Sequence, residues 1–229
     1  ANAYRQEEHG LSVHRYENEV FKAQEGYLDI LAAAIGAAVP MVNFLRCPYA
    51  RAFSSYMEVN NRFFIELEDA GRCPPAMQIR KHILRDTYGC DVPLDYPVGL
   101  GDYLAWLAGQ PPTGLEKHHS PQRGELYALP GIRHYRLEDA PRAIAQLEAE
   151  FGLRPSVDSQ AEFASTHHHR KLELGPEATL ELLRRGIPLT RSKYVPIPAI
   201  SRELLAVSEF GDLIEQAFRE DIRLYDSID

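Results

Sequence analysis

Cysteine pairs, long apolar runs and excess positive charge are all missing from this chain of 229 residues. Its three cysteines are odd in number and far apart, without a Cys-x-x-Cys pair. That spacing excludes a disulfide framework and a zinc ribbon, and it is typical of a reducing compartment, so we expect a cytoplasmic protein. The longest apolar stretch, 28–42, is interrupted by aspartate, glycine and proline, so no membrane span is predicted.

Positive charge is outnumbered, with 25 Lys and Arg against 33 Asp and Glu and a formal net charge of −8. This balance argues against a general nucleic-acid or anionic-membrane binder and leaves room for a local basic pocket. A hydrophobic content of 45% is ordinary for a core-forming chain, and the length predicts a single domain over 1–229. The chain begins at Ala1 without a methionine or a signal segment, so we expect that residues upstream have been lost.

Apolar periodicity predicts an α/β fold. A short apolar run at 39–45 and an alternating run at 131–137 are typical of strands. Helical spacing is expected at about 20–34, from 48 to before Gly71, and at 77–88, 101–108, 139–152, 176–185 and 201–224. Strands followed by helices favour a mostly parallel sheet, which is incomplete with so few strands.

An arginine and a serine flank the turn after the first strand. Arg46 follows the apolar run, a proline turn comes next, and Ser54 lies near the first turns of the following helix. A guanidinium, a hydroxyl and helix-terminal N–H groups suit a phosphate, and such strand ends are where α/β sheets hold ligands. The alternative is that Arg46 caps a surface loop and Ser54 faces solvent.

The pattern R-x-P-x-x-R-x-x-S-x-Y, formed by Arg46, Pro48, Arg51, Ser54 and Tyr56, resembles the 3′-phosphate motif of sulfotransferases. These enzymes use 3′-phosphoadenosine 5′-phosphosulfate (PAPS), and the resemblance is closest to the carbohydrate sulfotransferases and their bacterial relatives. It implies that Arg46 and Ser54 hold the 3′-phosphate, with Arg51 also binding the nucleotide and Tyr56 supporting the site. The family usually has aspartate after the first arginine, where this chain has cysteine.

Three later stretches resemble further family elements in the same order: 118–122 (H-x-x-P-Q), 136–138 (R-L-E) and 218–225 (F-x-x-D-I-x-L-Y). Together the resemblance covers roughly 39–226. It implies a P-loop-NTPase-like parallel sheet flanked by helices, incomplete at the N-terminus. The implied reaction moves a sulfuryl group from PAPS to a hydroxyl of a carbohydrate-like acceptor, without a metal.

One family element is not seen. Such enzymes need a glycine-containing loop with Lys and Ser or Thr ahead of the 3′-phosphate motif, and no glycine ahead of Arg46 is followed by lysine. We expect a fragment lacking its first strand and loop. The alternative is a non-catalytic homologue that binds a nucleotide or a glycan.

Histidine is the natural base near neutral pH. His14 occupies a region where related 2-O-sulfotransferases keep a catalytic histidine, and His118 lies in the loop before the Pro-Gln pair. Each has the alternative of a solvated loop histidine. Glu138 could also serve, although a structural partner of Arg136 or of a backbone N–H is the favoured interpretation.

Three consecutive histidines at 167–169 suggest a metal-dependent hydrolase as a less favoured alternative. They cannot all reach one ion from a helix or a strand, and no carboxylate or cysteine lies beside them at ligand spacing. We therefore predict no metal site and expect a surface loop here.

Overall fold

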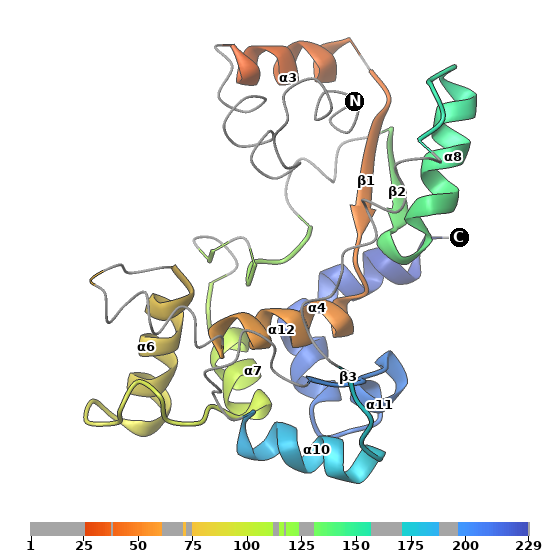
Figure 1. The fold of residues 1–229 in the computed structure, drawn as a ribbon. Coiled ribbons are helices and arrows are strands. Elements are labelled where there is room, and N and C mark those ends of the chain that lie inside the picture. The colour runs from red at the N-terminus through yellow and green to blue at the C-terminus, as the bar shows by residue number, and fades with distance from the viewer. Residues whose placement is uncertain are drawn as a thin grey trace. The chain divides into compact units, whose positions relative to one another are not determined.

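The computed structural model describes residues 26–37, 39–60, 71, 75–111, 115–116, 118–123, 131–156, 171–187 and 197–228. These residues form helices and short strands (Figure 1). The chain divides into two compact units. The first contains 1–43, 129–134 and 141–165, and the second contains 44–128, 135–140 and 166–229.

Strands β1 (Met41–Leu45) and β2 (Ile132–Arg136) form a two-stranded sheet, so both predicted strands are confirmed. Three contacts along and just beyond the strands keep one sequence separation: Asn43–His134, Phe44–Tyr135 and Cys47–Glu138. A constant separation, 91 residues here, is the pattern of a parallel pair, because an antiparallel register would make it change along the strands. The carboxyl ends of β1 and β2 therefore meet.

Helix α3 (Tyr27–Gly36), in the first unit, precedes β1 along the chain. The short 3₁₀ helix η3 (Leu137–Asp139), in the second unit, follows β2 and leads into α8 (Ala140–Glu150), which belongs to the first unit from its second residue on. Helix α8 ends at Glu150, two residues before the predicted stop at Gly152, which adopts a φ of 62° that other residues rarely take. The carboxylate of Glu148, which is buried, accepts the Ser156 N–H at 3.0 Å and fixes the chain after this stop.

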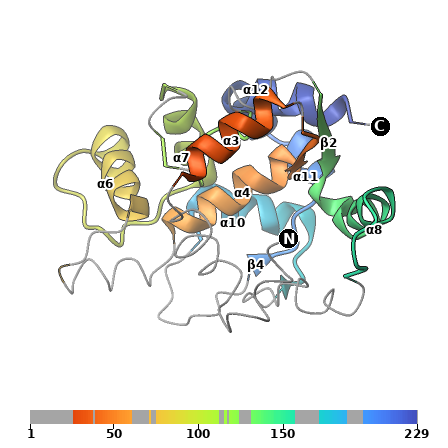
Figure 2. The same ribbon diagram turned by 90° about the horizontal axis from the view of Figure 1, so that it is seen from above.

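The second unit is mostly helical. Its elements are α4 (Pro48–Val59), α6 (Pro75–Tyr88), α7 (Leu100–Ala108), α10 (Pro176–Arg185), α11 (Arg202–Ala206), α12 (Gly211–Asp226) and the parallel strands β3 (Lys171–Leu172) and β4 (Ile197–Pro198). Helix α7 is the centre of this unit and contacts α4, α6, α10 and α12 (Figures 1 and 2).

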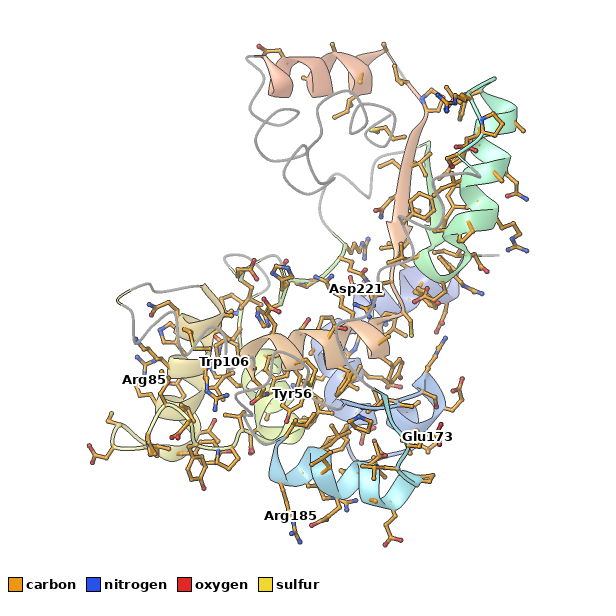
Figure 3. The ribbon with its side chains drawn as sticks, in the orientation of Figure 1. Tyr56, Arg85, Trp106, Glu173, Arg185 and Asp221 are labelled. Atoms are coloured by element: carbon orange, nitrogen blue, oxygen red, sulfur yellow. The ribbon has the colours of Figure 1, made fainter. Side chains whose placement is uncertain are left out.

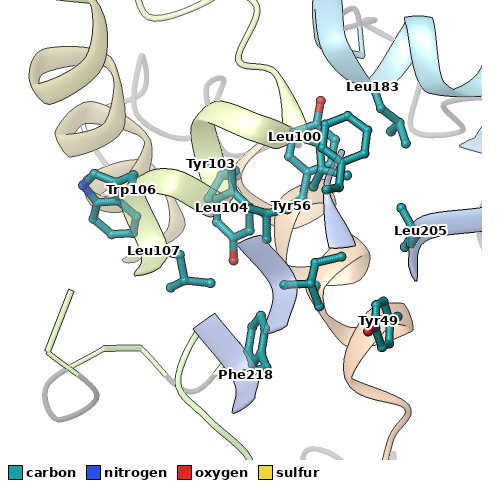
Figure 4. Packing of buried hydrophobic residues seen from close by; sticks show 14 of the residues in the cluster. Tyr49, Tyr56, Leu100, Tyr103, Leu104, Trp106, Leu107, Leu183, Leu205 and Phe218 are labelled. Atoms are coloured by element: carbon teal, nitrogen blue, oxygen red, sulfur yellow. The ribbon is translucent and has the colours of Figure 1, made fainter. Parts of the chain in front are cut away.

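The core of the second unit joins α4, α7 and α12. Tyr56, Tyr103, Leu104 and Phe218 are each at most 2% exposed (Figure 4). The ring centroids of Tyr56 and Tyr103 lie 6.0 Å apart. Because aromatic side chains bury large areas, these contacts fix α4 firmly against its neighbours. Helix α4 therefore gives the residues at its start a rigid support.

The predicted helices at 77–88, 101–108 and 176–185 are confirmed to within two residues at their starts. The single helix predicted over 201–224 is wrong, because the chain folds into α11 and α12 with a tight turn between them. At that turn a Cβ on Gly211 would lie 2.5 Å from the Ala206 carbonyl oxygen, so the turn needs glycine. Among the helices of the described residues, none is both long and apolar enough to cross a membrane.

Candidate functional site

The turn between β1 and α4 is fixed by the side-chain amide of Gln122. The Arg46 N–H donates to Gln122 Oε1 at 2.9 Å, and Gln122 Nε2 donates to the Arg46 carbonyl at 2.8 Å. The Arg46 guanidinium itself makes no hydrogen bond or ion pair with any described residue. The backbone of Arg46 is thus held while its cationic group stays available, directly before the N-terminus of α4.

The Glu138 carboxylate binds the backbone directly before α4. Its Oε1 accepts the Cys47 N–H at 2.9 Å, and its Oε2 accepts the Tyr225 hydroxyl at 3.1 Å. Burial, followed by the nearby Glu138 charge, raises the pKa of Tyr225 to about 12. The favoured interpretation of Glu138 as a partner of a backbone N–H is confirmed, and both carboxylate oxygens already have partners.

Asp221, on α12, fixes the loop that contains Gln122 (Figure 3). Its two oxygens accept the N–H groups of Gln122 at 2.7 Å and Arg123 at 2.8 Å. Asp221 is 1% exposed, and burial raises the pKa of its carboxyl, although the two backbone N–H groups act in the opposite direction. The C-terminal helix therefore orients the Gln122 side chain that holds Arg46.

The loop at 118–120 is bound to α4 and α7 by three polar contacts. Arg51 Nη2 donates to the Ser120 carbonyl at 2.5 Å, and Ser55 Oγ donates to the His118 carbonyl. The Tyr103 hydroxyl lies 2.9 Å from His119 Nδ1, with both side chains fully buried. Arg51 thus has a structural role, while its contact with a nucleotide stays a prediction. Burial lowers the pKa of Arg51.

His118 is exposed and paired with Glu116, a residue that the sequence analysis did not select. His118 Nδ1 lies 3.0 Å from both Glu116 carboxylate oxygens, and its side chain is 54% exposed. A half-buried second carboxylate, Glu58 of α4, interacts electrostatically with both, and burial raises its pKa. In the sequence, the one sign of this pairing is an acidic residue two positions before the histidine.

The remaining residues of the R-x-P-x-x-R-x-x-S-x-Y pattern differ in their surroundings. Ser54 is half-buried, and its hydroxyl has no hydrogen-bond partner within the described ranges. Tyr56 is fully buried, donates to the Val98 carbonyl at 2.9 Å and accepts the Ile187 N–H at 3.1 Å. Ser54 is available to a ligand, whereas Tyr56 supports the site through packing.

Two groups of predicted histidines cannot be compared with this site. His14 and the histidines at 167–169 lie outside the described residues. Within the part of the chain that the structure describes, no group of three or more His, Cys, Asp or Glu side chains is arranged to hold a metal.

Comparison with known proteins adds no relative: no family model, curated protein or solved structure matches the chain.

Proposed function

We propose that this chain is a PAPS-dependent sulfotransferase domain that acts on a hydroxyl of a carbohydrate-like acceptor. The observation that carries the proposal is the position of the Arg46 guanidinium and its lack of a partner within the described ranges. It follows the carboxyl end of a parallel strand, precedes the N-terminus of a 12-residue helix and has no partner among the described residues. Phosphate groups bind at such helix starts, and arginine is the side chain best suited to them.

Convergence of four distant stretches supports the proposal. The segments at 46–56, 118–122, 136–138 and 218–225 carry the resemblance, and all four meet around the turn before α4. Gln122 contacts Arg46, Glu138 contacts Cys47, and Asp221 contacts Gln122. The stretches that carry the resemblance thus meet at one place in the fold, as a shared binding site requires.

The strands support a P-loop-related fold in the proposed enzyme. β1 and β2 keep a parallel register, and each leads into a helix, α4 and α8 respectively. Parallel strands joined through helices are the arrangement of α/β nucleotide-binding domains, which hold their ligands at the carboxyl ends of the strands. The turn at Arg46 lies at that end.

The residues present fit the 3′-phosphate end of PAPS. The Arg46 guanidinium supplies charge-assisted donors, the Ser54 hydroxyl a further donor, and α4 its first N–H groups and positive dipole end. PAPS supplies an activated sulfuryl group: its S–O bond to the 5′-phosphate breaks as a new S–O bond forms at the acceptor oxygen. His118 takes the proton that the acceptor hydroxyl loses. Helix α4 rises by about 12 Å from Cys47, which follows Arg46, to Ser55, which holds the His118 carbonyl, so the phosphate-binding residue and the base are attached at different points along this helix.

Binding of 3′-phosphoadenosine 5′-phosphate, measured by calorimetry, tests the proposal. We compare it with adenosine 5′-phosphate, which lacks the 3′-phosphate, so that the difference between the two reports the Arg46 site alone. The parent should prefer the bisphosphate by at least tenfold, and Arg46→Ala should abolish that preference. Arg123→Ala is the matched control, because it removes an equal charge from an exposed neighbour that pairs with Glu220.

The measurement also separates the proposal from its alternative. Equal affinity of the folded parent for both nucleotides would refute the 3′-phosphate site. A preference for the bisphosphate without sulfate transfer would favour a non-catalytic nucleotide-binding homologue, an alternative motivated by the absence of a Gly-Lys pair ahead of Arg46.

A further inference from the structure

The carboxylate of Glu116 binds both the backbone and the ring of His118. The His118 N–H donates to Glu116 Oε2 at 2.8 Å, and ring Nδ1 lies 3.0 Å from Oε1 and from Oε2. Capping of a turn would explain the backbone contact alone. The ring contact is additional, and it restricts the rotation of the side chain.

This geometry selects one tautomer of the histidine. An ionised carboxylate has only acceptors, so Nδ1 must carry the hydrogen that faces it. In the neutral ring the lone pair then lies on Nε2, which makes no hydrogen bond with a described residue. Since the side chain is 54% exposed, Nε2 can accept a proton from a bound molecule.

Glu116 is itself held by its surroundings. Its side chain is only 22% exposed, and its carbonyl accepts the N–H groups of His119 at 2.8 Å and Ser120 at 2.9 Å. The turn that results is bound to α4 through Ser55 and Arg51. A histidine on a loop thus gains a fixed orientation from helices that belong to the core.

We infer that Glu116 is the positioning residue for His118, which acts as the base on the acceptor hydroxyl. The inference rests on the proposed function for the identity of the acceptor. Nε2 takes the hydroxyl proton while the acceptor oxygen bonds to sulfur, and the electron pair of the broken S–O bond goes to the 5′-phosphate oxygen. The carboxylate of Glu116 stabilises the imidazolium that forms, because its hydrogen bond to Nδ1–H becomes an ion pair.

The tautomer can be measured without any substrate. Long-range ¹H–¹⁵N correlation spectra of the full chain at pH 8.5, with the ring assigned through His118→Asn, report which nitrogen carries the hydrogen. In the parent, the Nδ1-protonated form should exceed the other by about tenfold. Glu116→Gln keeps an acceptor for the backbone N–H but can present either oxygen or NH₂ to the ring, so this preference should disappear.

Glu58→Gln is the matched control, because it removes a neighbouring carboxylate that is not hydrogen-bonded to the ring. Its spectrum should keep the tautomer of the parent. A parent ring protonated on Nε2, or a tautomer that Glu116→Gln leaves unchanged, would overturn the assignment of Glu116.

Transfer from PAPS to unsulfated chondroitin gives the second measurement. Glu116→Gln should lower kcat by about tenfold at unchanged KM, a share of the effect of a general base, while Glu58→Gln should stay within about twofold of the parent. An unchanged kcat in Glu116→Gln would also overturn the inference. If the parent transfers nothing but shows the predicted tautomer, the proposed function fails and the positioning of His118 by Glu116 still holds.

Discussion

Replacing Tyr56 with phenylalanine removes one hydroxyl from the core of the second unit and leaves two polar groups without a partner. The hydroxyl donates to the Val98 carbonyl at 2.9 Å and accepts the Ile187 N–H at 3.1 Å, and both residues are at most 2% exposed. Gly186 packs so closely here that a Cβ would lie 2.7 Å from the Val98 carbonyl oxygen. A water molecule therefore has little room to replace the hydroxyl.

The expected loss follows from these contacts. Each buried polar group left unsatisfied costs about 1–3 kcal/mol, so Tyr56→Phe should lower the free energy of unfolding by about 3 kcal/mol. Urea unfolding followed through the fluorescence of Trp106, the single tryptophan, measures the change in this unit. Tyr96→Phe is the control: Tyr96 is 40% exposed, and its loss should stay below about 0.5 kcal/mol.

The same variant separates packing from ligand binding. Because the Tyr56 hydroxyl already has two partners inside the protein, folded Tyr56→Phe should bind 3′-phosphoadenosine 5′-phosphate as the parent does. A change in unfolding free energy below 0.5 kcal/mol would refute the hydrogen-bond argument. Loss of nucleotide binding by a folded variant would instead show that Tyr56 contacts the ligand.

Three further predictions concern polar groups that are buried or half-buried. Burial lowers the pKa of His119 to about 4, below its ordinary value of about 6.5. Between these two pH values His119 is protonated in the unfolded chain and neutral in the folded one, so the free energy of unfolding falls as the pH falls. The loss between pH 7 and 4.5, measured by urea unfolding, should be about 2 kcal/mol larger in the parent than in His119→Gln, and equal losses would contradict this. Arg80 is fully buried and donates to three backbone carbonyls, so Arg80→Lys should lower the free energy of unfolding by about 3 kcal/mol in the same assay. Arg85→Lys, which changes an exposed arginine of the same helix, is the control and should unfold as the parent does. Gln122→Ala removes both hydrogen bonds to the Arg46 backbone and should weaken the binding of 3′-phosphoadenosine 5′-phosphate, measured by calorimetry, at least threefold. An unchanged affinity would show that these two hydrogen bonds are not needed for binding.

Local patterns in the sequence were sufficient for most of the helices and for both longer strands. The apolar run at 39–45 gave β1, and the alternation at 131–137 gave β2, because burial on a strand or helix imposes a period that is visible in the chain. The break between α11 and α12 left no such trace. It depends on a close approach of Gly211 to the Ala206 backbone, which periodicity does not encode.

The site was predicted in part. Glu138 was expected to bind a backbone N–H, but the sequence could not say that this N–H belongs to Cys47, 91 residues earlier. Glu116 was missed for a different reason. An acidic residue near an exposed histidine is common in loops, and only the turn that brings its carboxylate to Nδ1 distinguishes it.

Residues that carry the resemblance fall into two classes by their hydrogen bonds, and the classes have different consequences for function. Tyr56, Glu138 and Asp221 each bind two groups of the protein, so a ligand could recruit them only by breaking contacts worth about 1 kcal/mol or more apiece. The side chains of Arg46 and Ser54 have no such bonds among the described residues, so their donors can be used for binding without breaking a contact of the fold. The first class supports the start of α4, whereas the half-buried side chains of the second class keep donors that no described residue uses. Substitutions in the first class should therefore act on stability, and substitutions in the second on affinity.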